Sequence, residues 1–66
     1  MIDYTPHMTE SELYEAARAM ENYGGGFAES IALAFYRADG YNRKKLLSAF
    51  GDLFEKFHQF NQGEQA

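Results

Sequence analysis

The stretch Leu46–Phe57, LLSAFGDLFEKF, carries the strongest periodicity in this chain of 66 residues. Its apolar residues recur every third or fourth position, which places them on one face of an α-helix. Gly51 interrupts the series, and Asp52 followed three residues later by Glu55 is a capping-box pattern. We therefore expect a third helix that is kinked or split near Gly51, with its apolar face continuing across the break.

The start of the first helix is marked by four residues that agree with one another. Thr9 is placed to act as N-cap with Glu12 at position N3, which is a capping box. Met8 before the cap and Leu13 at position N4 complete a hydrophobic staple. The sequence thus predicts that a helix begins directly after Thr9.

The second helix is expected from Phe27 to Ala38, after the glycine run in YGGGF. We expect Gly24 to end the first helix in the left-handed conformation, which costs glycine little. Gly40 is placed to close the second helix, and either Asp39 or Asn42 to cap the third. Two short connections therefore separate three helices.

The fold class that follows is all-α: a small three-helix bundle in one domain. We expect residues 1–7 to form a short extended N-terminal arm, residues 8–60 the bundle and residues 61–66 a frayed polar tail. In the second expected helix, Ala28 and Ala32 leave a flank where another helix could approach closely. The expected core consists of Leu13, Met20, Phe27, Ile31, Phe35, Leu46, Phe50, Leu53, Phe54 and Phe57.

Composition restricts the location and the partners. The chain has no cysteine, and six phenylalanines and five tyrosines supply much of its apolar surface. Three short helices cannot easily cover so many rings, so we expect a homo-oligomer.

Neither a membrane span nor a signal peptide is recognisable, which favours the cytoplasm. The net charge of −4 argues against general nucleic-acid binding, because that affinity comes mainly from Lys and Arg.

Positive charge nevertheless gathers at the junction between the second and third helices, in GYNRKK at residues 40–45. Cations in the first turn of a helix oppose its dipole, so something should compensate them. Glutamates of the first helix could do so from within the molecule. A bound phosphate or acidic side chain could do so from outside. The candidate ligand-binding residues are Arg37, Tyr41, Arg43, Lys44 and Lys45.

Catalytic patterns are missing from the sequence. His7 and His58 belong to no metal-ligand spacing, and the serines lack the glycine-flanked nucleophile elbow. The carboxylates lie where helix capping and solvation already explain them. We therefore expect a protein that is not an enzyme and holds no metal or other cofactor.

Residues 24–57, about half of the chain, resemble a pattern common in small uncharacterised proteins of tailed bacteriophages and prophages. The pattern is Gly-Gly-x-Phe, then Ala-Asp-x-x-Asn-Arg, then Leu-x-x-Ala-Phe. Relatives often carry proline where this chain has Gly51, which agrees with a break there. The matching residues are Gly25, Gly26, Phe27, Ala38, Asp39, Asn42, Arg43, Leu46, Ala49, Phe50, Leu53 and Phe54.

The resemblance implies an origin and assigns no activity. Phage genomes encode many small acidic helical proteins that bind host or anti-phage defence components, and some sequester nucleotide signals. The first hypothesis is therefore a protein of the host cytoplasm that binds and diverts a host or defence protein. The alternative is a binder of a phosphorylated small molecule or nucleotide at the basic junction. A DNA-binding third helix is the least supported, because most of the surface is expected to be acidic.

Overall fold

The fold is all-α, as the sequence predicts. The structure is a computed structural model that describes residues 5–65, with side chains as far as Gln62. Residues 1–4, most of the expected arm, and Ala66 lie outside the described residues, and residues 5–9 precede the first helix. The third helix extends to Gln65, beyond the end at residue 60 that we expected. The helices are α1 (Glu10–Tyr23), α2 (Gly25–Arg37) and α3 (Gly40–Gln65).

The first helix begins where its capping signals place it. The backbone N–H of Glu12 donates to Thr9 Oγ1 at 3.2 Å, and the N–H of Thr9 donates to Glu12 Oε1 at 2.9 Å. Met8 packs against the core cluster that contains Leu13. The predicted capping box is therefore confirmed, and it satisfies two backbone donors that the helix itself cannot pair.

The glycine turn between α1 and α2 differs from the prediction. Gly24 has φ −91°, a right-handed value, and the positive φ of 79° belongs to Gly25. Gly24 is required for a different reason, since a Cβ built there would lie 2.5 Å from the Ala28 Cβ and 2.7 Å from the Met20 carbonyl oxygen. Close packing of the two helices therefore selects glycine at position 24, and backbone conformation selects it at position 25.

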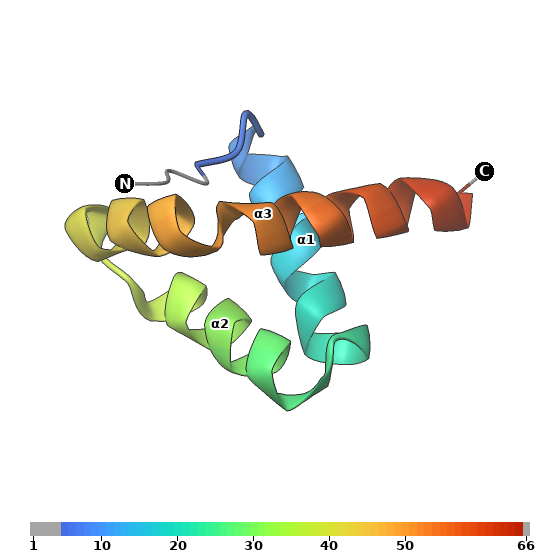
Figure 1. The fold of residues 1–66 in the computed structure, drawn as a ribbon, viewed down its shortest axis with the longest axis horizontal. Helices are drawn as coiled ribbons and strands as arrows, with labels where there is room; N and C mark the ends of the chain where they lie inside the picture. Colours follow the sequence, from blue (N-terminus) through green and yellow to red (C-terminus); the bar gives the residue numbers. More distant parts are fainter. Residues whose placement is uncertain (1–4, 66) are drawn as a thin grey trace.

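The helix α1 lies at the centre of the arrangement. It contacts both α2 and α3 extensively, whereas α2 and α3 contact each other little. In Figure 1, α2 and α3 diverge from their common junction, and α1 crosses α3 steeply instead of running alongside it. One side of the α2–α3 junction is consequently left uncovered by α1.

Small residues form much of the core, and the three largest fully buried side chains, Met20, Phe35 and Phe54, come one from each helix. The rings of Phe35 and Phe54 lie 5.1 Å apart between their centroids. The predicted close approach at Ala28 and Ala32 is confirmed by their burial. The buried apolar residues are Leu13, Ala16, Ala17, Ala19, Met20, Ala28, Ala32, Phe35, Leu47 and Phe54.

Several residues expected in the core are not fully buried, although Ile31, Leu46, Leu53 and Phe57 pack against the buried cluster. Phe27, in the first turn of α2, is 64% exposed, so its assignment to the core was wrong. Leu47 is the buried leucine of its pair, and Leu46 is half-buried. Ile31, Phe50, Leu53 and Phe57 are likewise half-buried.

The helix α3 contains one residue with non-helical backbone angles. Phe50 has φ −124° and ψ 16°, and helical structure continues on either side of it. Gly51, directly afterwards, is buried. The irregularity therefore coincides with the part of α3 that packs under the ring of Phe27, whose centroid lies 5.8 Å from that of Phe50.

Replacing Gly24 by alanine should lower the free energy of unfolding by about 1–3 kcal/mol, the usual cost of overpacking. Gly26→Ala is the matched control, because nothing lies within 4 Å of a Cβ at that position. It should leave stability unchanged or raise it by up to about 1 kcal/mol. Urea unfolding measures both variants, and equal stability of the two would contradict the packing described here.

Candidate functional site

The α2–α3 junction is a sharp reversal of the chain. The helix α2 ends at Arg37, and its C-cap Ala38 has extended backbone with φ −73° and ψ 137°. Asp39 then caps α3, because its Oδ1 accepts the N–H of Asn42 at 2.8 Å and its carbonyl oxygen accepts the N–H of Arg43 at 2.8 Å. Of the two caps that the sequence allowed, Asp39 is the one used. The first turn of α3 is thereby held beside the last turn of α2.

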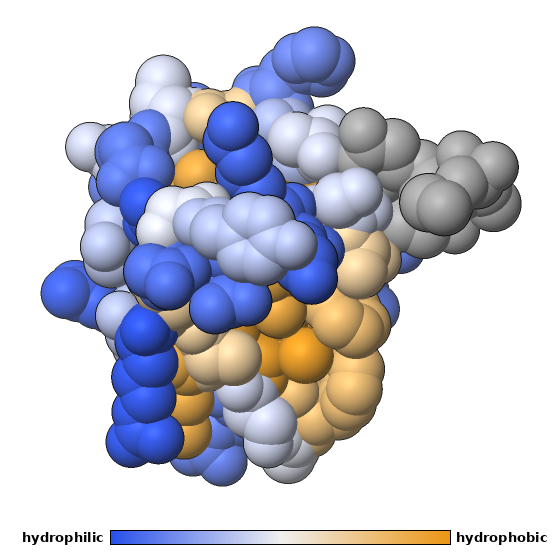
Figure 2. All heavy atoms as spheres, turned by 90° about the vertical axis from the view of Figure 1, so that its left-hand side faces the viewer, coloured by the Kyte–Doolittle hydropathy of each residue, from blue (hydrophilic) through white to orange (hydrophobic). Residues whose placement is uncertain are grey.

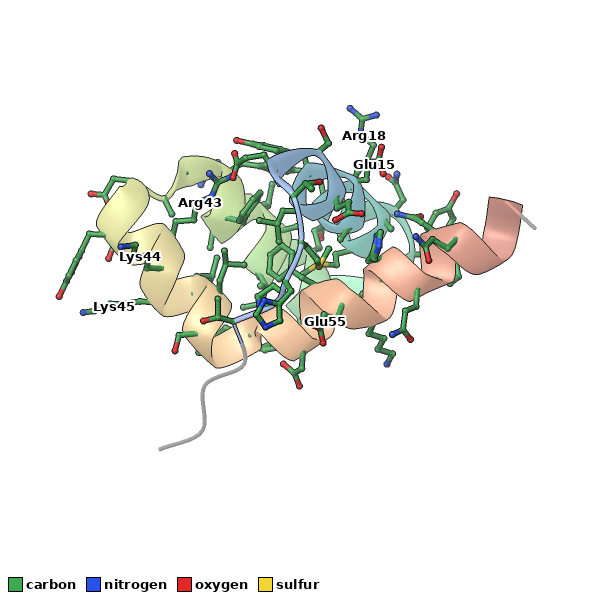
Figure 3. All side chains as sticks on the ribbon, turned by 90° about the horizontal axis from the view of Figure 1, so that it is seen from above. Glu15, Arg18, Arg43, Lys44, Lys45 and Glu55 are labelled. Atoms are coloured by element: carbon green, nitrogen blue, oxygen red, sulfur yellow. The ribbon has the colours of Figure 1, made fainter. Side chains whose placement is uncertain are left out.

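Arg43 points from this first turn toward α1 (Figure 3). Its Nη1 lies 2.9 Å from Glu10 Oε1 and 3.0 Å from Oε2, so a glutamate of α1 compensates this cation. The guanidinium carbon lies 4.2 Å from the centroid of the Phe35 ring. The internal explanation of the charged junction is thus confirmed for Arg43, which is only 23% exposed.

The remaining nitrogens of the Arg43 guanidinium, Nε and Nη2, are buried without a hydrogen-bond partner. The guanidinium carbon also lies 5.3 Å from the centroid of the Tyr14 ring of α1, and this ring packs edge to face on Phe35 with 5.1 Å between their centroids. The negative faces of aromatic rings attract a cation, and a sheltered Arg beside them is favoured more than an exposed one. Arg43 of α3 therefore contacts residues of both other helices.

The other four candidate residues remain on the surface. Arg37, Tyr41, Lys44 and Lys45 are exposed, and Lys45 Nζ lies 4.7 Å from the centroid of the Tyr41 ring. Lys44 and Lys45 lie on the outer side of α3 in Figure 3. The structure consequently divides the predicted site: four residues stay accessible, and the fifth is engaged within the fold.

An apolar hollow separates Arg37 from Lys45. Its volume is about 400 Å³, and it opens on the side of the junction that α1 leaves uncovered. Figure 2 looks onto this end of the molecule and shows an apolar area bordered by hydrophilic side chains. We call it the junction hollow. Its lining residues are Ala34, Arg37, Ala38, Asn42, Lys45, Leu46, Ala49 and Phe50.

The sequence analysis found the two cations of the junction hollow and missed its apolar floor. Ala34 and Ala38 belong to the apolar stripe of α2, and such a stripe is normally assigned to the core. Ala34 and Ala49 are in fact exposed, because α2 and α3 diverge there and no third helix covers them. Only the path of the helices reveals this surface.

The charges around the junction hollow have one sign. No carboxylate lines it, although the chain as a whole has a net charge of −4. Among the described side chains, neither Arg37 nor Lys45 forms an ion pair with Asp or Glu. The junction hollow therefore offers an apolar surface flanked by two uncompensated cations, one on each wall.

A second hollow, of about 570 Å³, lies between α1 and α2 and is mainly acidic. Two of its three carboxylates have partners: Glu10 is bonded to Arg43, and Glu21 accepts the Tyr36 hydroxyl at 2.7 Å. Partial burial and then this hydrogen bond raise the pKa of Tyr36 to about 12. The lining residues are Glu10, Ser11, Tyr14, Glu15, Arg18, Glu21 and Tyr36.

Within residues 5–62, no three His, Asp or Glu side chains converge on a point that would hold a metal ion. His58 Nε2 lies 3.6 Å from Glu12 Oε2, and this contact joins the second half of α3 to the start of α1. It also lies 3.2 Å from Gln62 Nε2, one turn further along α3.

None of the three described helices combines the length and the hydropathy that crossing a membrane requires.

Comparison of the chain with protein-family models, with curated proteins and with solved structures finds no match.

The sheltered position of Arg43 predicts a large difference between neighbouring cations. Arg43→Ala should lower the free energy of unfolding by about 1–2 kcal/mol through lost ring contacts. Lys44→Ala, the matched control on the exposed side of α3, should change it by less than about 0.5 kcal/mol. Urea unfolding of both variants checks this, and equal losses would show that Arg43 makes no special contact.

Tyr36 predicts a dependence of stability on alkaline pH. Its pKa is about 12 in the folded chain against an ordinary value of 10.0, so the protonated phenol favours folding. This contribution is complete below about pH 10 and is lost as the pH rises toward 12. Tyr36→Phe should therefore lose less stability than the wild type between those values, as measured by unfolding at each pH. Identical pH profiles would contradict the hydrogen bond to Glu21.

Proposed function

We propose that this chain is a non-enzymatic protein-binding module that docks on a host or anti-phage defence protein through the junction hollow. The single observation behind the proposal is the uncovered apolar floor between α2 and α3, flanked by Arg37 and Lys45. Apolar residues of this floor are in contact with water: Ala34 and Ala49 are exposed, and Leu46 and Phe50 are half-buried. Protein-binding surfaces combine such an apolar centre with a polar rim.

The sequence pattern shared with tailed-phage proteins supports placing this partner in an infected bacterial cell. Some small acidic helical proteins of that origin act by occupying a surface of another protein. The pattern includes Ala49 and Phe50 on the floor of the junction hollow and Asn42 on its edge. In this proposal the residues of the pattern contribute both to the fold and to the surface that meets the partner.

Self-association is part of the same proposal. Two rings that do not line the junction hollow are exposed near the glycine turn: Tyr23 is 64% exposed and Phe60 is 39% exposed. Tyr23 and Phe60 lie 5.4 Å apart between their centroids, so they form a joined apolar area. Contact between copies at this end would leave the junction hollow free for a partner.

Capture of a phosphorylated small molecule is the second candidate function. Tyr41, Lys44 and Lys45 favour it, because they are exposed beside the start of α3, where backbone N–H groups attract anions. Arg43, one of the candidate ligand-binding residues, is bonded to Glu10 instead. Arg37 and Lys45 flank an apolar floor that a phosphate would not use, so protein binding is the better-supported function.

The test is affinity capture from bacterial host lysate, followed by titration of the captured protein with the purified chain. Ala34→Glu places a charge on the floor of the junction hollow at an exposed helical position, and it should abolish capture. Gln59→Glu adds the same charge at an exposed position of α3 that does not line the hollow, and it should have no effect.

Equal capture by Ala34→Glu and the wild type would contradict the proposal, as would binding that does not saturate. Thermal unfolding with mononucleotides and cyclic nucleotides tests the second candidate in the same preparations. A nucleotide at 100 times its Kd should add about 2.7 kcal/mol to the free energy of unfolding. Such a shift, lost in Lys44→Glu and kept in Ala34→Glu, would replace protein binding by nucleotide capture.

A further inference from the structure

From the shape and the charge of the junction hollow, we infer that its occupant is an amphipathic helix of the partner protein, with an apolar stripe flanked by carboxylates. The inference deepens the proposed function and rests on it, since it specifies the chemistry of the segment that the same surface receives.

The walls of the junction hollow have the geometry that receives a helix. On one wall, Ala34 of α2 is followed four residues later by Ala38, the C-cap of that helix. On the other wall, Leu46 of α3 is followed four residues later by Phe50, the residue with non-helical backbone angles. The alanines are small and let another backbone approach closely. A helix lying in the trough between these two rows would place side chains at i, i+3, i+4 and i+7 on the apolar floor.

The charges determine which amphipathic helix fits. Arg37 and Lys45 stand on opposite walls, without carboxylate partners among the described side chains. A helix in the trough would have one flank facing each cation. Glutamate or aspartate on both flanks would be attracted to the site, and lysine there would be repelled. The net charge of this chain is −4, so an acidic helix is repelled by most of the remaining surface. The two cations of the junction hollow therefore direct such a helix to this site.

A second copy of this chain fits the junction hollow less well. The most acidic helix of the chain, α1, buries its apolar residues against α2 and α3 and exposes a polar face that includes Glu10, Ser11, Glu15 and Arg18. That face has carboxylates and one partly exposed ring, Tyr14, but no apolar stripe to cover the floor. A helix of another protein that carries both fits the junction hollow better.

The experiment titrates the full chain with three labelled helical peptides, measured by fluorescence anisotropy. The first has a leucine stripe at i, i+3, i+4 and i+7 flanked by glutamates, the second has the same stripe flanked by lysines, and the third is a scramble of the first. The first should bind saturably, at least about tenfold more tightly than the second, and more weakly as salt is raised. The scramble should not bind.

Charge reversal supplies the decisive variants. Arg37→Glu with Lys45→Glu should exchange the preference, so that the lysine-flanked peptide binds more tightly. Lys56→Glu, at an exposed position of α3 that does not line the junction hollow, should keep the wild-type preference. Ala34→Glu and, independently, Ala49→Glu should weaken the glutamate-flanked peptide at least about tenfold. Far-UV circular dichroism confirms that each variant is folded.

The possible failures are distinguishable. Equal binding of the two striped peptides, or an unchanged preference after charge reversal, overturns the inference and leaves protein binding at the junction hollow intact. Absence of all peptide binding, together with host-protein capture that Ala34→Glu does not affect, overturns both. Sedimentation of the chain alone tests whether a second copy occupies the junction hollow. Self-association that Ala34→Glu abolishes would identify a second copy as the occupant and overturn the inference.

Discussion

The contact of the Arg43 guanidinium with the Phe35 ring and with Glu10 is the constraint on which the rest of the structure depends. It joins the first turn of α3, the last turns of α2 and the start of α1 at one point. Because α2 and α3 contact each other little elsewhere, this point and the Asp39 cap decide how the two helices leave their junction. Their divergence beyond it creates the junction hollow.

Because of this contact, the positive charges of the junction fall into two groups, one paired within the fold and one exposed at the surface. Arg43 is neutralised inside the fold, where an unpaired cation would cost much more than on the surface. Arg37 and Lys45 remain exposed on the two walls of the junction hollow. One cluster of positive charge in the sequence thus contributes to packing at Arg43 and, in the function that we propose, to recognition at Arg37 and Lys45. The apolar floor between the two outer cations is what favours a protein segment over a small anion.

Local signals in the sequence predicted the fold class, the three helices and the capping box of Thr9, because their physics involves residues three or four positions apart. Predictions that depend on tertiary packing were less successful. Phe27 is exposed although it belongs to the apolar stripe of α2, and the positive φ belongs to Gly25, whereas close packing selects glycine at position 24. Charge clustering alone allowed both an internal and an external partner for Arg43, and only the path of α1 distinguishes them.

The most direct test of this account is nuclear magnetic resonance of the Arg43 side chain. A guanidinium held over the Phe35 ring should shift the adjacent δ-methylene protons upfield of those of exposed Arg37. Nuclear Overhauser contacts from these protons to the Phe35 ring should also be observed. Identical shifts for the two arginines, with no contact to the ring, would contradict the bracing role of Arg43 and the position of α3 that depends on it.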